Sequence, residues 1–249
     1  MSALILKLIA TITMLIDHIG FHYDITAFRV IGRLAFPIYL FLIYNGYRHS
    51  SNPFRYALRL GIFAVISQVP FSLGFYGVIW AKTGNVMFTL MICLLTLIAA
   101  DTLSKHKWLK WTSLVPFLGA FLMYYKHIIW TEYGDKAVLM MLVLFLIGEC
   151  KGVWKIVTGV GLAAAMNYGH LLTIARNILS GTDPILPVLG QFELIQLMAV
   201  LAIPLILLYN GKKGTMPGSP LAVKVQQYGF YLFYPAHMLI LWLITLIWK

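Results

Sequence analysis

Long apolar runs fill the chain from end to end, and the polar residues fall mostly at the borders of these runs. About 20 consecutive apolar residues are enough for a helix to cross the hydrocarbon core of a bilayer. The spacing of the runs predicts about nine membrane segments, at residues 3–22, 31–47, 56–80, 85–103, 108–124, 136–147, 153–172, 185–209 and 227–248.

Prolines interrupt several of these runs. Pro37, Pro204 and Pro235 lie inside predicted segments, where neighbouring helices or water can satisfy the carbonyl that each proline frees. In the third segment the stretch 67–70 ends in a proline and favours a division into two half-helices. The pattern as a whole predicts an all-α fold, a polytopic transmembrane helix bundle formed by one domain over residues 1–249.

Composition supports this interpretation. Hydrophobic residues make up 61% of the chain and charged residues 11%, whereas a soluble domain carries about 25% charged residues. The apolar runs leave no room for a separate soluble domain. A net charge of +11 would suggest nucleic acid in a soluble protein, but here it is interpreted as loop charge, and no nucleic-acid partner is expected.

Lysine and arginine are distributed unequally between the predicted loops. The even-numbered loops, which share a side with the N-terminus, hold the larger share. Cytoplasmic loops are the ones enriched in these residues, so we expect a cytoplasmic N-terminus and an outside C-terminus in the cell membrane. These loops contain Arg48, Arg55, Arg59, Lys105, Lys107, Lys110, Lys151, Lys155, Lys212, Lys213 and Lys224.

Two further expectations concern processing and redox state. Residues 1–20 lack a basic leading region and a small-residue cleavage site, so they are not expected to form a cleavable signal peptide. Cys93 and Cys150 lie inside apolar runs, and a disulfide framework is therefore not expected.

The first segment ends in an acid and an imidazole, Asp17 and His18. Charged groups at membrane depth are costly and often mark a functional site. They could instead cap the helix in the headgroup region. His237 lies mid-segment after Pro235 and is open to the same two interpretations, a site residue or a histidine satisfied by one interhelical hydrogen bond. Other polar residues within or beside segments are Arg33, Gln68, Asn85, Asn167, His170, Glu193 and Gln196.

Two histidines and an acid suit more than one chemistry. A carboxylate beside an imidazole makes a general base, and His22, one turn after His18, could add a metal ligand. Motifs of zinc proteases, serine hydrolases and nucleotide-binding loops are absent from the sequence, so these classes have no support.

The order and spacing of several blocks resemble the TraX family, membrane proteins named for an acetyltransferase that caps the N-terminus of a conjugative pilin. The family is grouped with a wider set of transmembrane acyltransferases. One departure is Glu132-Tyr133-Gly134, where the family often has Asp-Tyr-Gly. The matching blocks are Lys7-Leu-Ile-Ala, Met14-Leu-Ile-Asp17-His18-Ile-Gly20, Gly32-Arg33-Leu-Ala-Phe-Pro37, Gly46-Tyr-Arg-His49, Tyr56-Ala-Leu-Arg59-Leu, Asn85-Val-Met-Phe-Thr89-Leu, Tyr209-Asn-Gly211 and Tyr231-Leu-Phe-Tyr234-Pro235-Ala-His237.

The resemblance implies acyl transfer from an acyl-CoA, with acetyl-CoA as the expected donor and no metal. The acceptor is a hydroxyl or amine on a cell-surface polymer, a pilin or a peptide, and the sequence does not say which. Phosphates of the donor need cations. The candidates for donor binding are Arg33, Arg48, Arg55, Arg59, Lys212 and Lys213, together with Tyr234.

Catalytic roles are expected for His18, Asp17, His237 and Glu132. His18 is the expected general base, oriented by Asp17 or Glu132 and supported by His237. Adjacent helical residues do not face each other, so Asp17 could instead hold Arg33. The alternative function is a small-molecule or proton-coupled transporter, in which buried histidine, arginine and aspartate relay protons. Transporters often show two related halves, and this sequence shows no such repeat.

Overall fold

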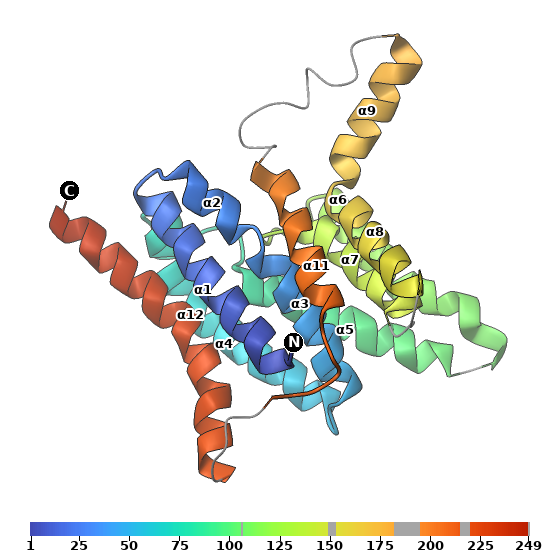
Figure 1. Cartoon of the computed structure of the whole chain (residues 1–249), viewed down its shortest axis with the longest axis horizontal. Coiled ribbons are helices and arrows are strands. Elements are labelled where there is room, and N and C mark those ends of the chain that lie inside the picture. Colours follow the sequence, from blue (N-terminus) through green and yellow to red (C-terminus); the bar gives the residue numbers. More distant parts are fainter. Residues whose placement is uncertain (106, 149–152, 182–194, 215–219, 249) are drawn as a thin grey trace.

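The computed structural model describes residues 1–105, 107–148, 153–181, 195–214 and 220–248. These ranges are built of helices packed into a bundle, which confirms the predicted all-α class (Figure 1). In chain order the elements are α1 (Ala3–His22), α2 (Thr26–Gly32), α3 (Ala35–Arg48), α4 (Pro53–Tyr76), α5 (Val86–Ser104), η1 (Lys107–Leu114), α6 (Val115–Tyr125), α7 (Gly134–Ile147), α8 (Val153–Met166), α9 (Tyr168–Ser180), η3 (Met198–Leu201), α11 (Ala202–Leu207) and α12 (Pro220–Trp248).

Five helices in the described ranges are long and apolar enough to cross a membrane, so the chain is a multi-pass membrane protein. Nine crossings are not confirmed, because the helices in the middle of the chain are short. Part of the predicted eighth segment, together with Glu193 and Cys150, lies outside the described residues. The five spans are Ala3–His22, Thr26–Arg48, Pro53–Tyr76, Val86–Ser104 and Val223–Ile247.

Helix α4 shows how such a span divides its faces. Leu58, Ile62 and Val65 are at least half exposed and recur at the spacing of one helical face. Ala64 and Gln68 are buried on the opposite face. In a bilayer, apolar side chains can face lipid, whereas a polar group needs a partner inside the protein. The exposed face is therefore the lipid-facing one.

The predicted division of α4 into two half-helices is wrong, since the helix runs unbroken through Pro70. Gln68 does not interrupt the helix, because its buried side chain forms hydrogen bonds with residues before and at the start of α5. Its Nε2 donates to the Thr83 carbonyl at 2.9 Å, and its Oε1 accepts from the side-chain Nδ2 of Asn85 at 3.0 Å. Gln68 thus fixes the loop before α5. A break in α4 would leave backbone groups without hydrogen bonds at the lipid-facing surface, which is costly in a membrane.

The second span bends between α2 and α3, at Gly32, Arg33 and Leu34. Pro37 lies in the first turn of α3, where its missing N–H has no intrahelical role. The bend turns Arg33 into the bundle, where it is buried. Gly32 allows this, because a Cβ at Gly32 would lie 2.1 Å from the Cβ of Asp17 on α1.

Helices α1 and α12 run side by side in the same direction. Lys7 of α1 lies 4.9 Å from the ring of Phe230 of α12. Farther along both helices, His18 contacts His237. The start of α1 also contacts residues 212 and 213 of the segment that follows α11, since the Ala3 amide donates to the Lys212 carbonyl at 2.9 Å. The first and last helices therefore form one wall of the bundle.

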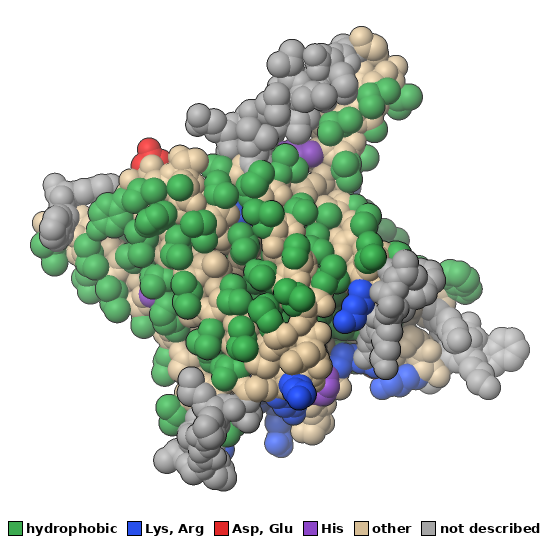
Figure 2. Space-filling model, in the orientation of Figure 1, with side chains coloured by type: hydrophobic (Ala, Val, Ile, Leu, Met, Phe, Trp, Pro, Cys, Tyr) green, Lys and Arg blue, Asp and Glu red, His purple; other side chains and the backbone are tan. Residues whose placement is uncertain are grey.

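Surface charge marks the end at which α1 begins. Figure 2 shows a face covered largely by hydrophobic side chains, with lysine and arginine gathered along its lower edge. That edge lies at the N-terminus of the chain in Figure 1. The bundle thus has one basic end, and α1 leads away from it.

We expect Gly32→Ala to destabilise the bundle by about 1–3 kcal/mol, because the new methyl group would overlap Asp17. Gly119→Ala is the matched control, since a Cβ there meets nothing within 4 Å. It should be neutral or stabilising by up to about 1 kcal/mol. Unfolding free energies in mixed detergent micelles measure both, and equal stability of the two variants would contradict the close approach of α2 to α1.

Candidate active site

A cavity of about 1150 Å³ opens between the far end of α1, the bend after α2, the loop before α5 and the loop before α7. Its lining combines buried ionic groups with many aromatic rings. Among the lining residues are Asp17, His18, Arg29, Arg33, Glu132, Tyr133, Lys136, Gln196 and Tyr234. The predicted residues of the first, second and last segments thus meet at this cavity.

Asp17 is held by two guanidinium groups. Arg33 Nη2 donates to both carboxylate oxygens at 2.6 Å, and Arg29 Nη1 donates to Oδ2 at 2.8 Å. Asp17 and Arg33 are both 7% exposed. A buried ion pair needs such close geometry to offset the loss of hydration. Asp17 therefore pairs with Arg33 and not with its neighbour His18, which is the second of the two arrangements that the sequence left open.

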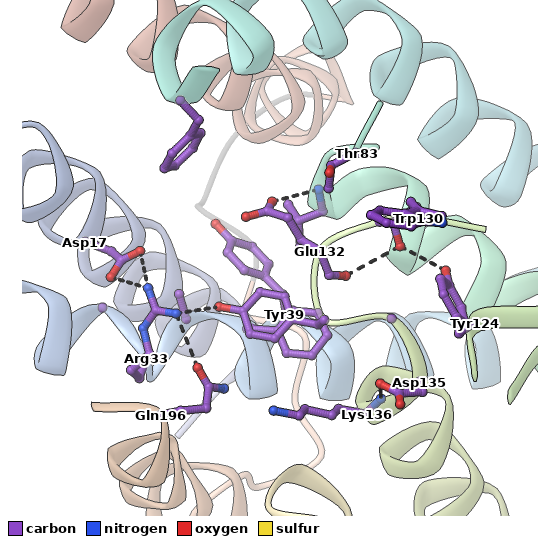
Figure 3. Close-up of a pocket in the computed structure, with 18 of the residues that line it drawn as sticks. Asp17, Arg33, Tyr39, Thr83, Tyr124, Trp130, Glu132, Asp135, Lys136 and Gln196 are labelled. Carbon is purple, nitrogen blue, oxygen red and sulfur yellow. Dashed lines mark hydrogen bonds and ion pairs between the residues drawn. The ribbon is translucent and has the colours of Figure 1, made fainter. Parts of the chain in front are cut away.

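Arg33 connects this pair to the opposite wall. Its Nη1 donates to the Gln196 side-chain oxygen at 3.4 Å, and the Tyr133 hydroxyl lies 3.5 Å away (Figure 3). Its Nε donates to the Arg29 carbonyl at 3.3 Å. All three nitrogens of the guanidinium are engaged, so Arg33 is a fixed part of the wall.

His18 contacts His237 directly. The two rings are nearly coplanar, with an interplanar angle of 1°, and His18 Nδ1 lies 2.6 Å from His237 Nε2. The centroids are farther apart, at 4.9 Å, so the rings meet edge to edge. His18 lines the cavity and His237 lies behind it. Both are buried, at 6% and 5% exposure.

The partner of His237 fixes the proton positions in an uncharged pair. His237 Nδ1 lies 2.6 Å from the Phe233 carbonyl, which can only accept, so this nitrogen carries a hydrogen. His237 Nε2 then accepts from His18 Nδ1–H. The remaining nitrogen of His18, Nε2, keeps its lone pair. The geometry therefore favours the tautomer of His18 that can accept a proton at Nε2.

Glu132 sits in the loop before α7, beside the start of α5. Its Oε2 accepts from the Val86 amide at 3.0 Å, at a helix N-terminus where negative charge is favourable. Burial raises the pKa of the Glu132 carboxyl to about 7, against the opposing charge of Arg33. A carboxyl group with that pKa can both take up and release a proton near neutrality. Glu132 makes no hydrogen bond to His18 in the described structure, so it does not orient His18 directly.

Backbone geometry holds Glu132 in place. The Glu132 amide donates to the Gly84 carbonyl at 3.1 Å, and Thr131 pairs with Gly84 as an isolated bridge. Tyr133, next in the chain, has a φ of 61°. A non-glycine residue in this region is strained by about 1–3 kcal/mol and persists only where its surroundings hold it. Here the Tyr133 ring stacks on Phe36 with centroids 3.7 Å apart.

Tyr234 lines the cavity from α12, one turn before His237. It is 4% exposed, and its ring centroid lies 6.4 Å from that of His18. Its hydroxyl has no hydrogen-bond partner among the described residues. The nearby Val86 amide donates to Glu132 instead. A buried hydroxyl without a partner costs free energy, which is consistent with a role in binding a ligand.

The other predicted donor-binding residues lie at the basic end. The carbonyls of Lys212 and Lys213 accept from the first residues of α1, and Arg48 ends α3. Arg55 and Arg59 lie in the first turns of α4, with Arg59 5.6 Å above the ring of Tyr56. None of the five lines the cavity. From Ala3 to Asp17, α1 spans roughly 20 Å. Lys212 and Lys213, at the start of α1, are therefore about that far from Asp17 along the helix.

Arg29, Lys136 and Gln196 are among the cavity residues that received no site role from the sequence. Arg29 precedes Arg33 by four residues, so both lie on one face, and that spacing is the signal that could have found it. Gln196 was noted only as a polar residue in an apolar run. Lys136 lies in the first turn of α7 and gave no signal beyond its charge.

Comparisons with known proteins identify a family and relatives to which this chain is similar. The model of one protein family, described as "TraX protein", matches residues 2–245. A probable fimbrial assembly protein FimC, serogroup H1, of Dichelobacter nodosus is 33% identical over 96% of this chain and 94% of its own length. An uncharacterized protein, RP591, of Rickettsia prowazekii (strain Madrid E) is 39% identical over 26% of this chain and 25% of its own. No solved structure is significantly similar.

Asp17→Asn leaves the buried guanidinium of Arg33 and the partly buried one of Arg29 without their anion, and we expect it to cost about 3–5 kcal/mol of unfolding free energy. Asp24→Asn makes the same chemical change at an exposed loop residue with a φ of 54°. It should be nearly neutral, because asparagine tolerates that conformation. Unfolding in mixed micelles compares the two, and a neutral Asp17→Asn would show that the ion pair does not contribute to stability.

Proposed function

Because the chain belongs to the TraX family, we propose that it is an integral membrane acetyltransferase that uses acetyl-CoA as donor. The acceptor is an amine or a hydroxyl group. The similarity to a probable fimbrial assembly protein favours a pilin or another surface component as the molecule that carries it. The observation that carries the proposal is the His18–His237 pair at the wall of a cavity.

In the proposed reaction His18 acts as the general base. Its Nε2 takes the proton of the acceptor as the acceptor nitrogen or oxygen attacks the thioester carbonyl carbon. The carbon–sulfur bond then breaks, and the departing thiolate takes the proton from the imidazolium to give free CoA. The Tyr234 hydroxyl is proposed to donate to the carbonyl oxygen, and its lack of a partner among the described residues supports this role.

His237 is the positioning residue in this scheme. By accepting from His18 Nδ1–H it fixes the tautomer with a lone pair on Nε2. It takes the place that a carboxylate holds in many base–nucleophile arrangements, but it is an uncharged group. Glu132 can exchange protons with solvent near neutrality, since its pKa is about 7. Asp17 contributes through Arg33, by fixing the wall beside His18.

The donor is proposed to bind with its phosphates at the basic end of the bundle. Its acyl group must then reach about 20 Å along α1 to His18. The pantetheine arm of the donor is long and narrow, which suits such a passage. Under the proposed orientation, with the basic loops in the cytoplasm, the donor comes from the cytoplasm and the acceptor from the outer side.

We expect His18→Ala to lower kcat by a factor of about 10²–10⁴, the usual contribution of a general base, while acetyl-CoA still binds. His237→Ala should cost less. His237→Gln should restore part of that loss, because the glutamine oxygen can accept from His18 Nδ1–H. Release of CoA thiol by purified protein with an amine acceptor gives the rates. Full activity in His18→Ala would rule out this mechanism.

We expect Arg59→Gln or Lys213→Gln to raise the KM for acetyl-CoA with kcat nearly unchanged, as for a contact made equally in ground and transition states. The effect should fade at high salt, because exposed charges are screened. Lys82→Gln, an exposed lysine elsewhere in the chain, is the control. Unchanged KM values in both variants would place the donor phosphates away from the basic end.

A further inference from the structure

The cavity contains hydrogen-bond donors that the proposed transfer does not use. His18, Glu132 and Tyr234 form the part of the lining described above as catalytic. Arg29, Lys136 and Gln196 line the same cavity without a role in proton transfer. A ligand in this cavity can therefore be held by one group of residues while it reacts at another.

Arg29 is only partly used by Asp17. One carboxylate serves both Arg29 and Arg33, so the three groups together carry a net positive charge. Arg29 engages Asp17 through Nη1. Its Nη2 and Nε make no hydrogen bond to any described residue, and its side chain is 18% exposed. The Phe21 ring, 5.4 Å from its Cζ, keeps the guanidinium in place.

Lys136 and Gln196 add two further donors. Figure 3 shows both side chains reaching into the cavity. The Gln196 oxygen accepts from Arg33, which leaves its NH₂ group for the cavity, and Gln196 is 9% exposed. Lys136 makes no ion pair within the described ranges. Its neighbour Asp135 is already bonded, by the Lys136 amide at 2.9 Å and by the Tyr168 hydroxyl.

The balance of charge in the lining favours an anion. Arg33 is compensated by Asp17, and the Asp135 carboxylate has two donors of its own. Glu132 is charged only in part near neutrality, because its pKa is about 7. Arg29 shares Asp17 with Arg33, and Lys136 has no ion pair within the described ranges, so the lining keeps an excess of positive charge. Hydrogen bonds from cations to carboxylates or phosphates are short and strong, and low-dielectric walls strengthen them.

The geometry points to a subsite, formed by Arg29, Lys136 and Gln196, that holds a carboxylate or phosphate carried by the acceptor. This inference rests on the proposed function. The acceptor would place its amine or hydroxyl at His18 and its acidic group at the subsite, in one molecule. The substrate class is then an acidic amine or alcohol, and a neutral analogue would bind less well.

The first test measures binding of inorganic phosphate to the whole protein in detergent micelles at constant ionic strength. The unfolding temperature of the wild type should rise with phosphate. Lys136→Gln, which removes no described ion pair, should weaken the apparent phosphate affinity about tenfold, the loss of one charge-assisted contact. Arg29→Gln should do the same, and Lys82→Gln should match the wild type. No phosphate effect in the wild type, or an unchanged affinity in Lys136→Gln, would overturn the subsite.

The second test separates an acid of the acceptor from the phosphates of the donor. Lys136→Gln should leave the affinities for CoA and for pantetheine, which lacks the phosphates, unchanged. A selective loss of CoA affinity would assign the subsite to the donor and overturn the inference. In acetyl transfer, the KM for glucosamine 6-phosphate should rise about tenfold in Lys136→Gln, and that for glucosamine should not change. Phosphate binding without any transfer would support the subsite and count against the acetyltransferase.

Discussion

The buried ion pair between Asp17 and Arg33 sets the arrangement of the rest of the site. It joins α1 to the bend after α2 at a depth where an unpaired charge would be very costly. Its geometry requires a glycine at position 32, because α2 approaches α1 more closely than a Cβ allows. Successive residues on a helix point about 100° apart. Fixing Asp17 toward α2 therefore turns His18 away from it, toward α12 and His237.

The sequence predicted the parts of the fold that depend on the membrane itself. Length and apolarity located α1, α4 and α5 to within a few residues, because any spanning helix must satisfy these conditions. The last helix was also found, but it begins at Pro220, ahead of its predicted start at residue 227. They also indicated that polar residues such as Arg33 and Gln68 face inward. The number of crossings was not confirmed, since α6, α7, α8 and α9 are short and their apolar runs do not correspond to full spans.

The candidate site could be predicted only in part. Costly residues in distant segments were expected to meet, and Asp17, Arg33, His18 and His237 do so in pairs. The partner that each acid meets depends on how far each helix is rotated about its own axis. The apolar runs in the sequence carry no information about that rotation. The basic end and the cavity are separated along α1, and this separation follows from tertiary packing. The strained turn at Tyr133 has no signal in composition, because its φ is imposed by the neighbouring Gly84 loop and by Phe36.

The hydrogen bond between His18 and His237 joins residues 219 positions apart. During synthesis the first helix enters the bilayer long before the last one has been made. Until α12 is inserted, His18 lacks the group that orients it, and the wall of the cavity that carries Tyr234 is missing. A nascent or truncated chain without α12 would therefore lack half of the histidine pair. The centre at the wall of the cavity is therefore assembled only once both ends of the chain have been inserted.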